Sequence, residues 1–332
     1  MTPSHFLFAS TLTLGTLITI SSSTWLGIWM GLEMNLLSFI PLMAQLGKFS
    51  AEAALKYFLT QAFASATLLL GILGTQLITP SNDSLNYLIT TLMIFSLLVK
   101  MGAAPTHFWF PEVSNGLSWS SNMILMTWQK IAPFIALLYL GTPFIYMVLV
   151  VSTSAIVGGL GGFNQTSMRK ILAFSSINHM AWMLMGIYAS QQIWSTYFIT
   201  YSVMTIVMML YFNMHNINFI HQLQYTNSVS PTETFAVSMN MLSMGGLPPF
   251  LGFYPKWLVM EYMMSASLYI MATFMITMTL IVLYFYMRIT YASFMMFSKT
   301  LKPYMSNLKL TPSLLMWTPL LGLGPAPLLM MM

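Results

Sequence analysis

The sequence contains no cysteine and very little charge. Without cysteine, the chain forms no disulfide and supplies no thiolate ligand for an iron–sulfur cluster. Charged residues make up 5% of the 332 residues, whereas a soluble domain carries about 25%. The eleven basic residues form no cluster, which argues against binding of nucleic acid. The five histidines lack the paired spacing of metal ligands, so no metal site is predicted.

Apolar residues fill most of the chain. Hydrophobic residues account for 57% of the sequence, and such a chain cannot cover a water-facing surface. Because a membrane-spanning helix needs about 20 apolar residues, the composition predicts an all-α, polytopic membrane protein. Turn and breaker residues divide the sequence into about eleven apolar segments. These are residues 5–21, 25–46, 51–78, 85–104, 119–140, 143–160, 168–188, 193–219, 232–264, 268–297 and 311–332.

Basic residues in the loops predict an orientation. They occur after the second, sixth and tenth segments, as Lys48, as Arg169 with Lys170, and as Lys299, Lys302 and Lys309. All of these loops are even-numbered, so they share one side of the membrane with the N-terminus. By the positive-inside rule that side is the cytoplasm, or the matrix of a mitochondrion. An odd number of spans then puts the C-terminus on the opposite side.

Glycine and proline interrupt two of the apolar segments. The first interruption lies in Lys100–Glu112 and contains Pro105, and the second lies in Gly245–Trp257 and contains Pro248 and Pro249. Proline removes a backbone donor, and the freed carbonyls need protein or a water-filled cavity around them. Paired interruptions of this kind are typical of a transport site in an inverted-repeat transporter.

The positions of the two interruptions predict the internal organisation. They fall in the fourth and ninth segments, five segments apart. This spacing predicts one transmembrane domain over residues 1–332, built from two inverted five-helix repeats, each with one broken helix. The repeats are residues 1–140 and 143–297, and a C-terminal helix follows at 311–332.

Four ionisable residues interrupt long apolar runs, namely Glu33, Lys100, Lys130 and Lys256. A charge near the bilayer centre costs about 2.5–3.5 kcal/mol, so such residues usually face a bundle interior or a water-filled path. Lys100 and Lys256 could instead reach the membrane surface, and Glu33 could be a neutral core residue. Burial favours a neutral lysine and a nearby carboxylate favours the charged one, so an array of such residues suits proton transfer. Glu33 is predicted to face Lys100.

Weaker candidates are Lys56, His107 and His179. Each also has a purely structural interpretation. Lys56 would form a surface ion pair with Glu52, four residues before it, and the two histidines would be hydrogen-bonded core residues. The glycines of 158–162 lack the spacing of a dinucleotide-binding motif, and we interpret them as sites of close helix packing.

Six motifs stand out in the chain, in residues 29–41, 52–61, 100–112, 127–133, 161–180 and 245–257. Together they resemble NADH dehydrogenase subunit 2, an antiporter-like family in the membrane arm of respiratory complex I. They recur in the family's order over nearly the whole chain, least clearly in 299–332, and most closely match the animal mitochondrial form.

The resemblance implies a proton-translocating subunit of the mitochondrial inner membrane, with its N-terminus in the matrix and its C-terminus in the intermembrane space. The family's fold has fourteen helices, of which animal forms lack the first three. The resemblance gives proton-transfer roles to the glutamate of the fifth helix and to the lysines of the seventh, eighth and twelfth helices. These positions correspond to Glu33, Lys100, Lys130 and Lys256.

The resemblance also implies which partners and cofactors to expect. Other membrane-arm subunits, including antiporter-like ones, and membrane lipids would surround this chain. NADH, FMN, iron–sulfur clusters and ubiquinone would bind other subunits, so no cofactor site and no redox centre are expected here. Two alternatives stay open: a free-standing cation/proton antiporter of the same fold, and a purely structural membrane anchor.

Overall fold

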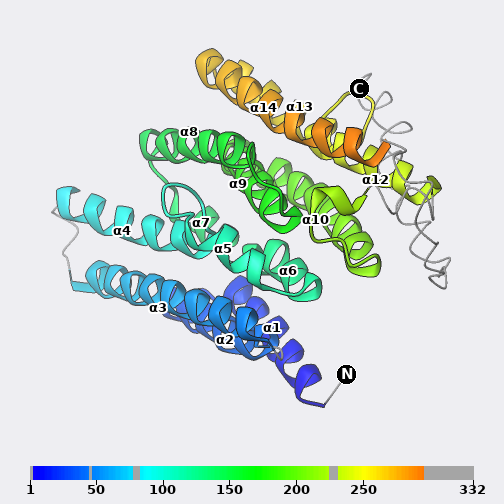
Figure 1. The fold of residues 1–332 in the computed structure, drawn as a ribbon. Helices are drawn as coiled ribbons and strands as arrows, with labels where there is room; N and C mark the ends of the chain where they lie inside the picture. Colours follow the sequence, from blue (N-terminus) through cyan, green and yellow to red (C-terminus); the bar gives the residue numbers. More distant parts are fainter. Residues whose placement is uncertain (1–2, 45–46, 78–82, 224–230, 295–332) are drawn as a thin grey trace. The chain divides into compact units, whose positions relative to one another are not determined.

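The computed structural model describes residues 3–44, 47–77, 83–223 and 231–294, and the described part consists of helices and their connections, with one isolated β-bridge and no strand (Figure 1). Eight helical stretches among the described residues are long and apolar enough to cross a membrane. The predicted all-α membrane class is therefore confirmed. The number of eleven spans is not established, because the predicted helix 311–332 lies outside the described residues.

The chain forms two compact units, Met1–Met147 and Val148–Met332. The inverted relation predicted for the repeats stays a prediction. Unit 1 contains α1 (Pro3–Ser21), α2 (Trp25–Met43), α3 (Lys48–Leu77), α4 (Asp83–Met101), α5 (Trp109–Gly116), α6 (Trp119–Met126) and α7 (Trp128–Leu140). The boundary falls just after the first turn of α8 (Phe144–Gly161), most of which belongs to unit 2. Unit 2 also contains α9 (Met168–Ala189), α10 (Gln191–Met214), the short 3-10 helix Ile220–Gln222, α12 (Pro231–Gly245), α13 (Phe253–Ser265) and α14 (Tyr269–Phe294).

In unit 1, α7 is the helix that meets most of the others, since it contacts α1, α2, α4 and α6. Close packing of α1 on α2 depends on small residues. A Cβ atom added to Gly31 would lie 2.7 Å from the carbonyl oxygen of Gly15. Such a short separation excludes any larger side chain, so glycine lets the two helices approach.

In unit 2, α9 is the most buried of the spans and contacts α10, α13 and α14. The glycines at the end of α8 pack against neighbouring helices. A Cβ atom on Gly158 would lie 2.5 Å from the backbone nitrogen of Asn178, and one on Gly162 would lie 2.9 Å from the ring of Phe285. The packing interpretation of this glycine cluster is confirmed.

The predicted fifth segment, 119–140, is not one continuous helix. It is apolar enough to span, but Thr127 separates α6 from α7. The hydroxyl of Thr127 donates to the Met123 carbonyl at 2.7 Å, and the Lys130 amide donates to the Thr127 carbonyl at 3.3 Å. Pro133 has no amide hydrogen for the carbonyl four residues before it, which weakens the same stretch of helix. The predicted segment 119–140 is therefore confirmed as a candidate span, but the break at Thr127 was not predicted.

Candidate functional site

The first interruption begins where α4 ends, at Met101. Gly102 has a left-handed φ of 74°, which favours glycine. Its amide donates to the Val99 carbonyl at 3.1 Å, and the Ala103 amide donates to the Leu98 carbonyl at 3.1 Å. This pair of hydrogen bonds is a Schellman motif, which satisfies carbonyls that the helix end leaves free. The chain then runs without helix, through Pro105, until α5.

Lys100 lies in the last turn of α4 and is 7% exposed. Its backbone carbonyl accepts a hydrogen bond from Nε2 of Gln61 on α3 at 3.3 Å. Positive charge in the last turn of a helix is stabilised by the helix dipole. Lys100 is therefore buried within unit 1 at a helix end, and it does not extend to the surface.

The second interruption repeats the motif of the first. After α12 ends at Gly245, Gly246 has a φ of 85° and donates to the Ser243 carbonyl at 2.9 Å. The Leu247 amide donates to the Leu242 carbonyl at 3.4 Å, which completes a second Schellman motif. Residues 248 and 249, the two prolines, follow before α13 begins at Phe253.

Lys256 reaches back from α13 to the end of α12. Its Nζ atom donates to the Met244 carbonyl at 3.1 Å and to the Gly245 carbonyl at 2.9 Å, and the residue is 5% exposed. Two carbonyls at a helix C-terminus are a favourable partner for an ammonium group. Gly246 leaves room for this side chain, because a Cβ atom there would lie 2.7 Å from Nζ of Lys256.

Lys130 is the most deeply buried of the three lysines, at 1% exposure. It lies in the first turn of α7, and its Nζ atom is 5.3 Å from the ring centroid of Phe110. This is a cation–π distance. Since Phe110 belongs to α5, the interruption after α4 positions an aromatic ring over the lysine of another helix.

Glu33, on α2, is half-buried. Its Oε2 atom is buried and has no hydrogen-bond partner among the described residues. The carboxylate is close enough for its charge to act on Lys100 and on Tyr57. No ion pair within 4 Å joins Glu33 to Lys100 in the part of the chain that the structure describes. The predicted facing arrangement therefore stays a prediction.

Three neutral polar side chains from α2, α3 and α7 are hydrogen-bonded in unit 1, and the sequence analysis missed them. Gln129, next to Lys130, donates from Nε2 to Oδ1 of Asn35 at 3.0 Å. The hydroxyl of Tyr57 donates to Oε1 of Gln129 at 3.4 Å. Asn35 and Tyr57 are both buried. The sequence did signal these polar residues, because Asn35 is close to Glu33 and Gln129 is next to Lys130. Their hydrogen-bond partners, however, depend on how α2, α3 and α7 pack together.

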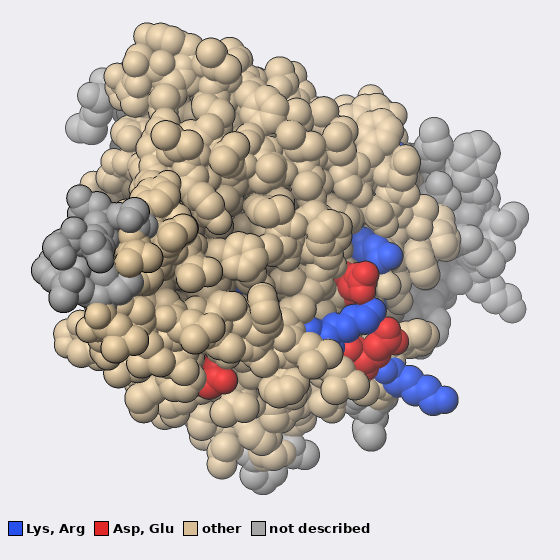
Figure 2. Space-filling view, turned by 90° about the vertical axis from the view of Figure 1, so that its left-hand side faces the viewer, with Lys and Arg blue, Asp and Glu red and all other residues tan. Residues whose placement is uncertain are grey.

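Lys56 is half-exposed and forms two ion pairs, one with Glu52 at 3.0 Å and one with Glu112 at 2.8 Å. The expected ion pair with Glu52 is present, and the pair with Glu112 was not foreseen. Figure 2 shows how few charged side chains one face of the molecule carries.

The two candidate histidines lie in different surroundings. Nδ1 of His107 is 3.2 Å from the Pro105 carbonyl, within the first interruption. Nδ1 of His179 is 3.0 Å from the hydroxyl of Tyr197, and His179 is 2% exposed. Neither histidine is near two further ligands, since no group of three metal-binding side chains occurs among the described residues.

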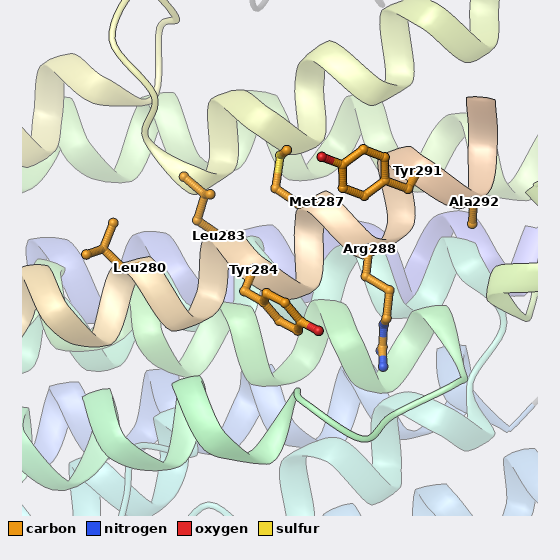
Figure 3. Close-up of a pocket in the computed structure, with 7 residues that line it drawn as sticks. All are labelled: Leu280, Leu283, Tyr284, Met287, Arg288, Tyr291 and Ala292. Atoms are coloured by element: carbon orange, nitrogen blue, oxygen red, sulfur yellow. The ribbon is translucent and has the colours of Figure 1, made fainter. Parts of the chain in front are cut away.

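A groove of about 640 Å³ runs along α14, with all its described lining residues on that helix (Figure 3). Tyr284 and Arg288 point to one side of the helix. Arg288 donates to the carbonyls of Phe163 at 2.8 Å and Gln165 at 2.7 Å. The guanidinium is thus bonded to the loop after α8, and none of the buried lysines is among the described residues that line the groove.

Comparison with known proteins identifies close relatives of this chain. The family described as NADH:quinone oxidoreductase/Mrp antiporter, transmembrane, matches residues 22–282. NADH-ubiquinone oxidoreductase chain 2 of Anopheles gambiae is 48% identical over 298 residues, which cover 88% of this chain and 86% of that protein. The protein of the same name from Aedes aegypti is 46% identical, with the same coverage of both chains.

Solved structures share the fold. A chain of respiratory complex I from Thermus thermophilus with bound aureothin is 27% identical, with a TM-score of 0.88 over 98% of this chain and 79% of that chain. A chain of the Mrp complex from Dietzia sp. has a TM-score of 0.76 over 86% of this chain and 59% of that chain. At 18% identity, the second likeness concerns the fold alone.

Proposed function

Because the chain belongs to the NADH-ubiquinone oxidoreductase chain 2 family, within the NADH:quinone oxidoreductase/Mrp antiporter group, we propose that its buried lysines transfer protons across the membrane. The protein is a proton-translocating membrane subunit of NADH:ubiquinone oxidoreductase. The observation that carries the proposal is the burial of Lys100, Lys130 and Lys256, at 7%, 1% and 5% exposure, each beside an interruption of a helix.

The geometry at Lys256 supports a site that can exist in two protonation states. Burial favours the neutral amine, whereas the two carbonyls at the end of α12 favour the ammonium. Because the two effects oppose each other, a change in the surroundings of the amine can shift its proton. Lys130, over the ring of Phe110, and Lys100, at the end of α4, experience the same two effects from different partners.

We place the chain in the mitochondrial inner membrane, as the names of its relatives suggest, with the N-terminus in the matrix. Glu33, Lys100, Lys130 and Lys256 are the proposed main sites, and Lys56, His107 and His179 are secondary ones. The redox cofactors are assigned to other subunits. The expected partners are other membrane-arm subunits and lipids.

The test is proton uptake by vesicles that contain the assembled complex. We expect Lys100→Met and Lys256→Met each to lower the protons moved per NADH oxidised, while the amount of assembled complex stays near normal. Lys48→Met, an exposed lysine at the start of α3, is the control. Normal uptake in both variants would favour a structural anchor. Proton exchange by the purified chain alone in liposomes would favour a free-standing antiporter.

A further inference from the structure

A buried ionisable pair lies outside the lysine sites, in unit 2. Nε2 of His215 is 3.0 Å from Oε2 of Glu233, and the two side chains are 11% and 8% exposed. His215 follows the last residue of α10, and Glu233 lies in the first turn of α12. The ring of Tyr211 packs 4.5 Å from the imidazole. Burial of two ionisable groups is costly even when they are paired, so the pair needs an explanation.

The pair lies at the end of unit 2 that carries the basic loop. Three residues beyond His215, the Asn218 carbonyl accepts from the Met168 amide at 2.9 Å. The Asn218 side chain accepts from Nη2 of Arg169 at 2.9 Å. These bonds join the segment after α10 to the start of α9, beside Lys170. His215 is thus close to the end of the unit that the positive-inside rule assigns to the matrix.

A buried polar stripe along α12 starts at Glu233. Asn240 and Ser243 follow at seven and ten residues, which brings them to the same face of the helix. Both are fully buried, and the Ser243 hydroxyl is 3.2 Å from Oδ1 of Asn240. Asn240 also donates to the Met204 carbonyl on α10 at 3.2 Å. Hydrogen bonds offset the cost of burying these groups, and together they place a row of polar atoms between Glu233 and the end of α12.

The stripe ends at Lys256. The Met244 and Gly245 carbonyls, the next backbone groups on α12, both accept from its Nζ atom. Eleven residues from Glu233 to Met244 span about 16 Å of helix. The two turns between Glu233 and Asn240, about 10 Å, are the step that requires water molecules.

We propose that His215 and Glu233 form a proton-loading site that exchanges protons between the basic end of unit 2 and Lys256. The proposal rests on the proposed function, because it assumes that Lys256 carries protons. A proton taken up by the imidazole of His215 crosses the 3.0 Å contact to the Glu233 carboxylate. The carboxylic acid becomes a carboxylate again when its proton moves along α12, and the neutral amine of Lys256 becomes an ammonium.

The competing explanation is structural. A glutamate in the first turn of a helix stabilises that turn through the helix dipole, and the contact with His215 ties α10 to α12. Glu233→Gln separates the two explanations. Glutamine has the same shape and still accepts a hydrogen bond from the imidazole, but it cannot carry a proton.

We expect Glu233→Gln in the assembled complex to lose most of the proton uptake coupled to NADH oxidation. Glu233→Asp, which keeps the carboxylate, should retain more uptake than Glu233→Gln. Glu261→Gln removes a carboxylate from an exposed position on α13 and should behave as wild type. His215→Gln is the second test of the pair and should lose uptake as Glu233→Gln does. Normal uptake in Glu233→Gln or His215→Gln would overturn the proposal.

Lys256→Met, measured in parallel, separates this proposal from the function on which it rests. If Lys256→Met takes up protons normally, Lys256 does not carry protons, and the proposed loading site is then wrong as well. If Lys256→Met loses uptake and Glu233→Gln does not, only the loading site is wrong. Loss of uptake in both, with normal assembly, supports the site.

Discussion

Lys130→Met should abolish proton transfer at this position and leave the fold nearly intact. Methionine resembles lysine in length and volume, and volume-conserving swaps in a packed interior usually cost less than about 1.5 kcal/mol. The variant loses the cation–π contact with Phe110, worth about 0.5–2 kcal/mol. It also removes a charge from a site that is 1% exposed, where the burial of one ion costs several kcal/mol. These effects oppose each other, so we expect little change in stability.

The assay follows proton uptake and NADH oxidation together in vesicles that contain the assembled variant complex. We expect the ratio of protons to NADH to fall while the complex assembles to wild-type amounts. Lys48→Met makes the same chemical change at an exposed position and controls for the loss of positive charge. A normal ratio and normal turnover in Lys130→Met would remove Lys130 from the proton path.

The contact with Phe110 can be measured separately by a double-mutant cycle with Phe110→Leu. If the ring stabilises a charged Lys130, Phe110→Leu should destabilise the wild type more than it destabilises Lys130→Met. The difference is the coupling free energy, expected at about 0.5–2 kcal/mol. Equal costs in both backgrounds would show that the ring contributes packing alone.

Three further predictions concern the two interruptions. Gly252→Ala should destabilise the complex by about 1–3 kcal/mol in thermal unfolding, because its Cβ atom would overlap the Ser243 carbonyl. Gly246→Ala should lower the free energy of unfolding by about 1–3 kcal/mol, because alanine is strained at a left-handed φ. It should also lower proton uptake, because the added Cβ atom would displace the side chain of Lys256. Glu112→Gln, which breaks a solvent-exposed ion pair, should leave both thermal stability and proton uptake unchanged.

Gly159→Ala is the matched control for the first two variants. Its added Cβ atom would lie 3.5 Å from the Met278 carbonyl, an ordinary contact, so the variant should behave as wild type. Wild-type stability in Gly252→Ala would contradict the close approach of α12 and α13. Normal uptake in Gly246→Ala would show that the position of Lys256 does not matter. A loss of uptake in Glu112→Gln would show that the ion pair of Lys56 with Glu112 is needed for proton transfer.

The sequence by itself determined the class of the protein, the apolar segments and the three buried lysines. These follow from local properties, because a run of apolar residues must be helical in lipid and a lysine within it is conspicuous. The two interruptions could also be predicted from the sequence, because glycine and proline change the backbone within a few residues. The missed break at Thr127 shows the limit, because its signal was only a threonine hydroxyl and a proline six residues later.

Only the tertiary structure decided which polar groups meet. Gln129 bonds to Asn35, 94 residues away, and Lys130 lies over Phe110, and neither contact has a signature in spacing. The pair of His215 and Glu233 joins two helices whose ends are brought together by packing. Periodicity tells which face of a helix is apolar, but the partner of a side chain depends on how separate helices are placed against one another.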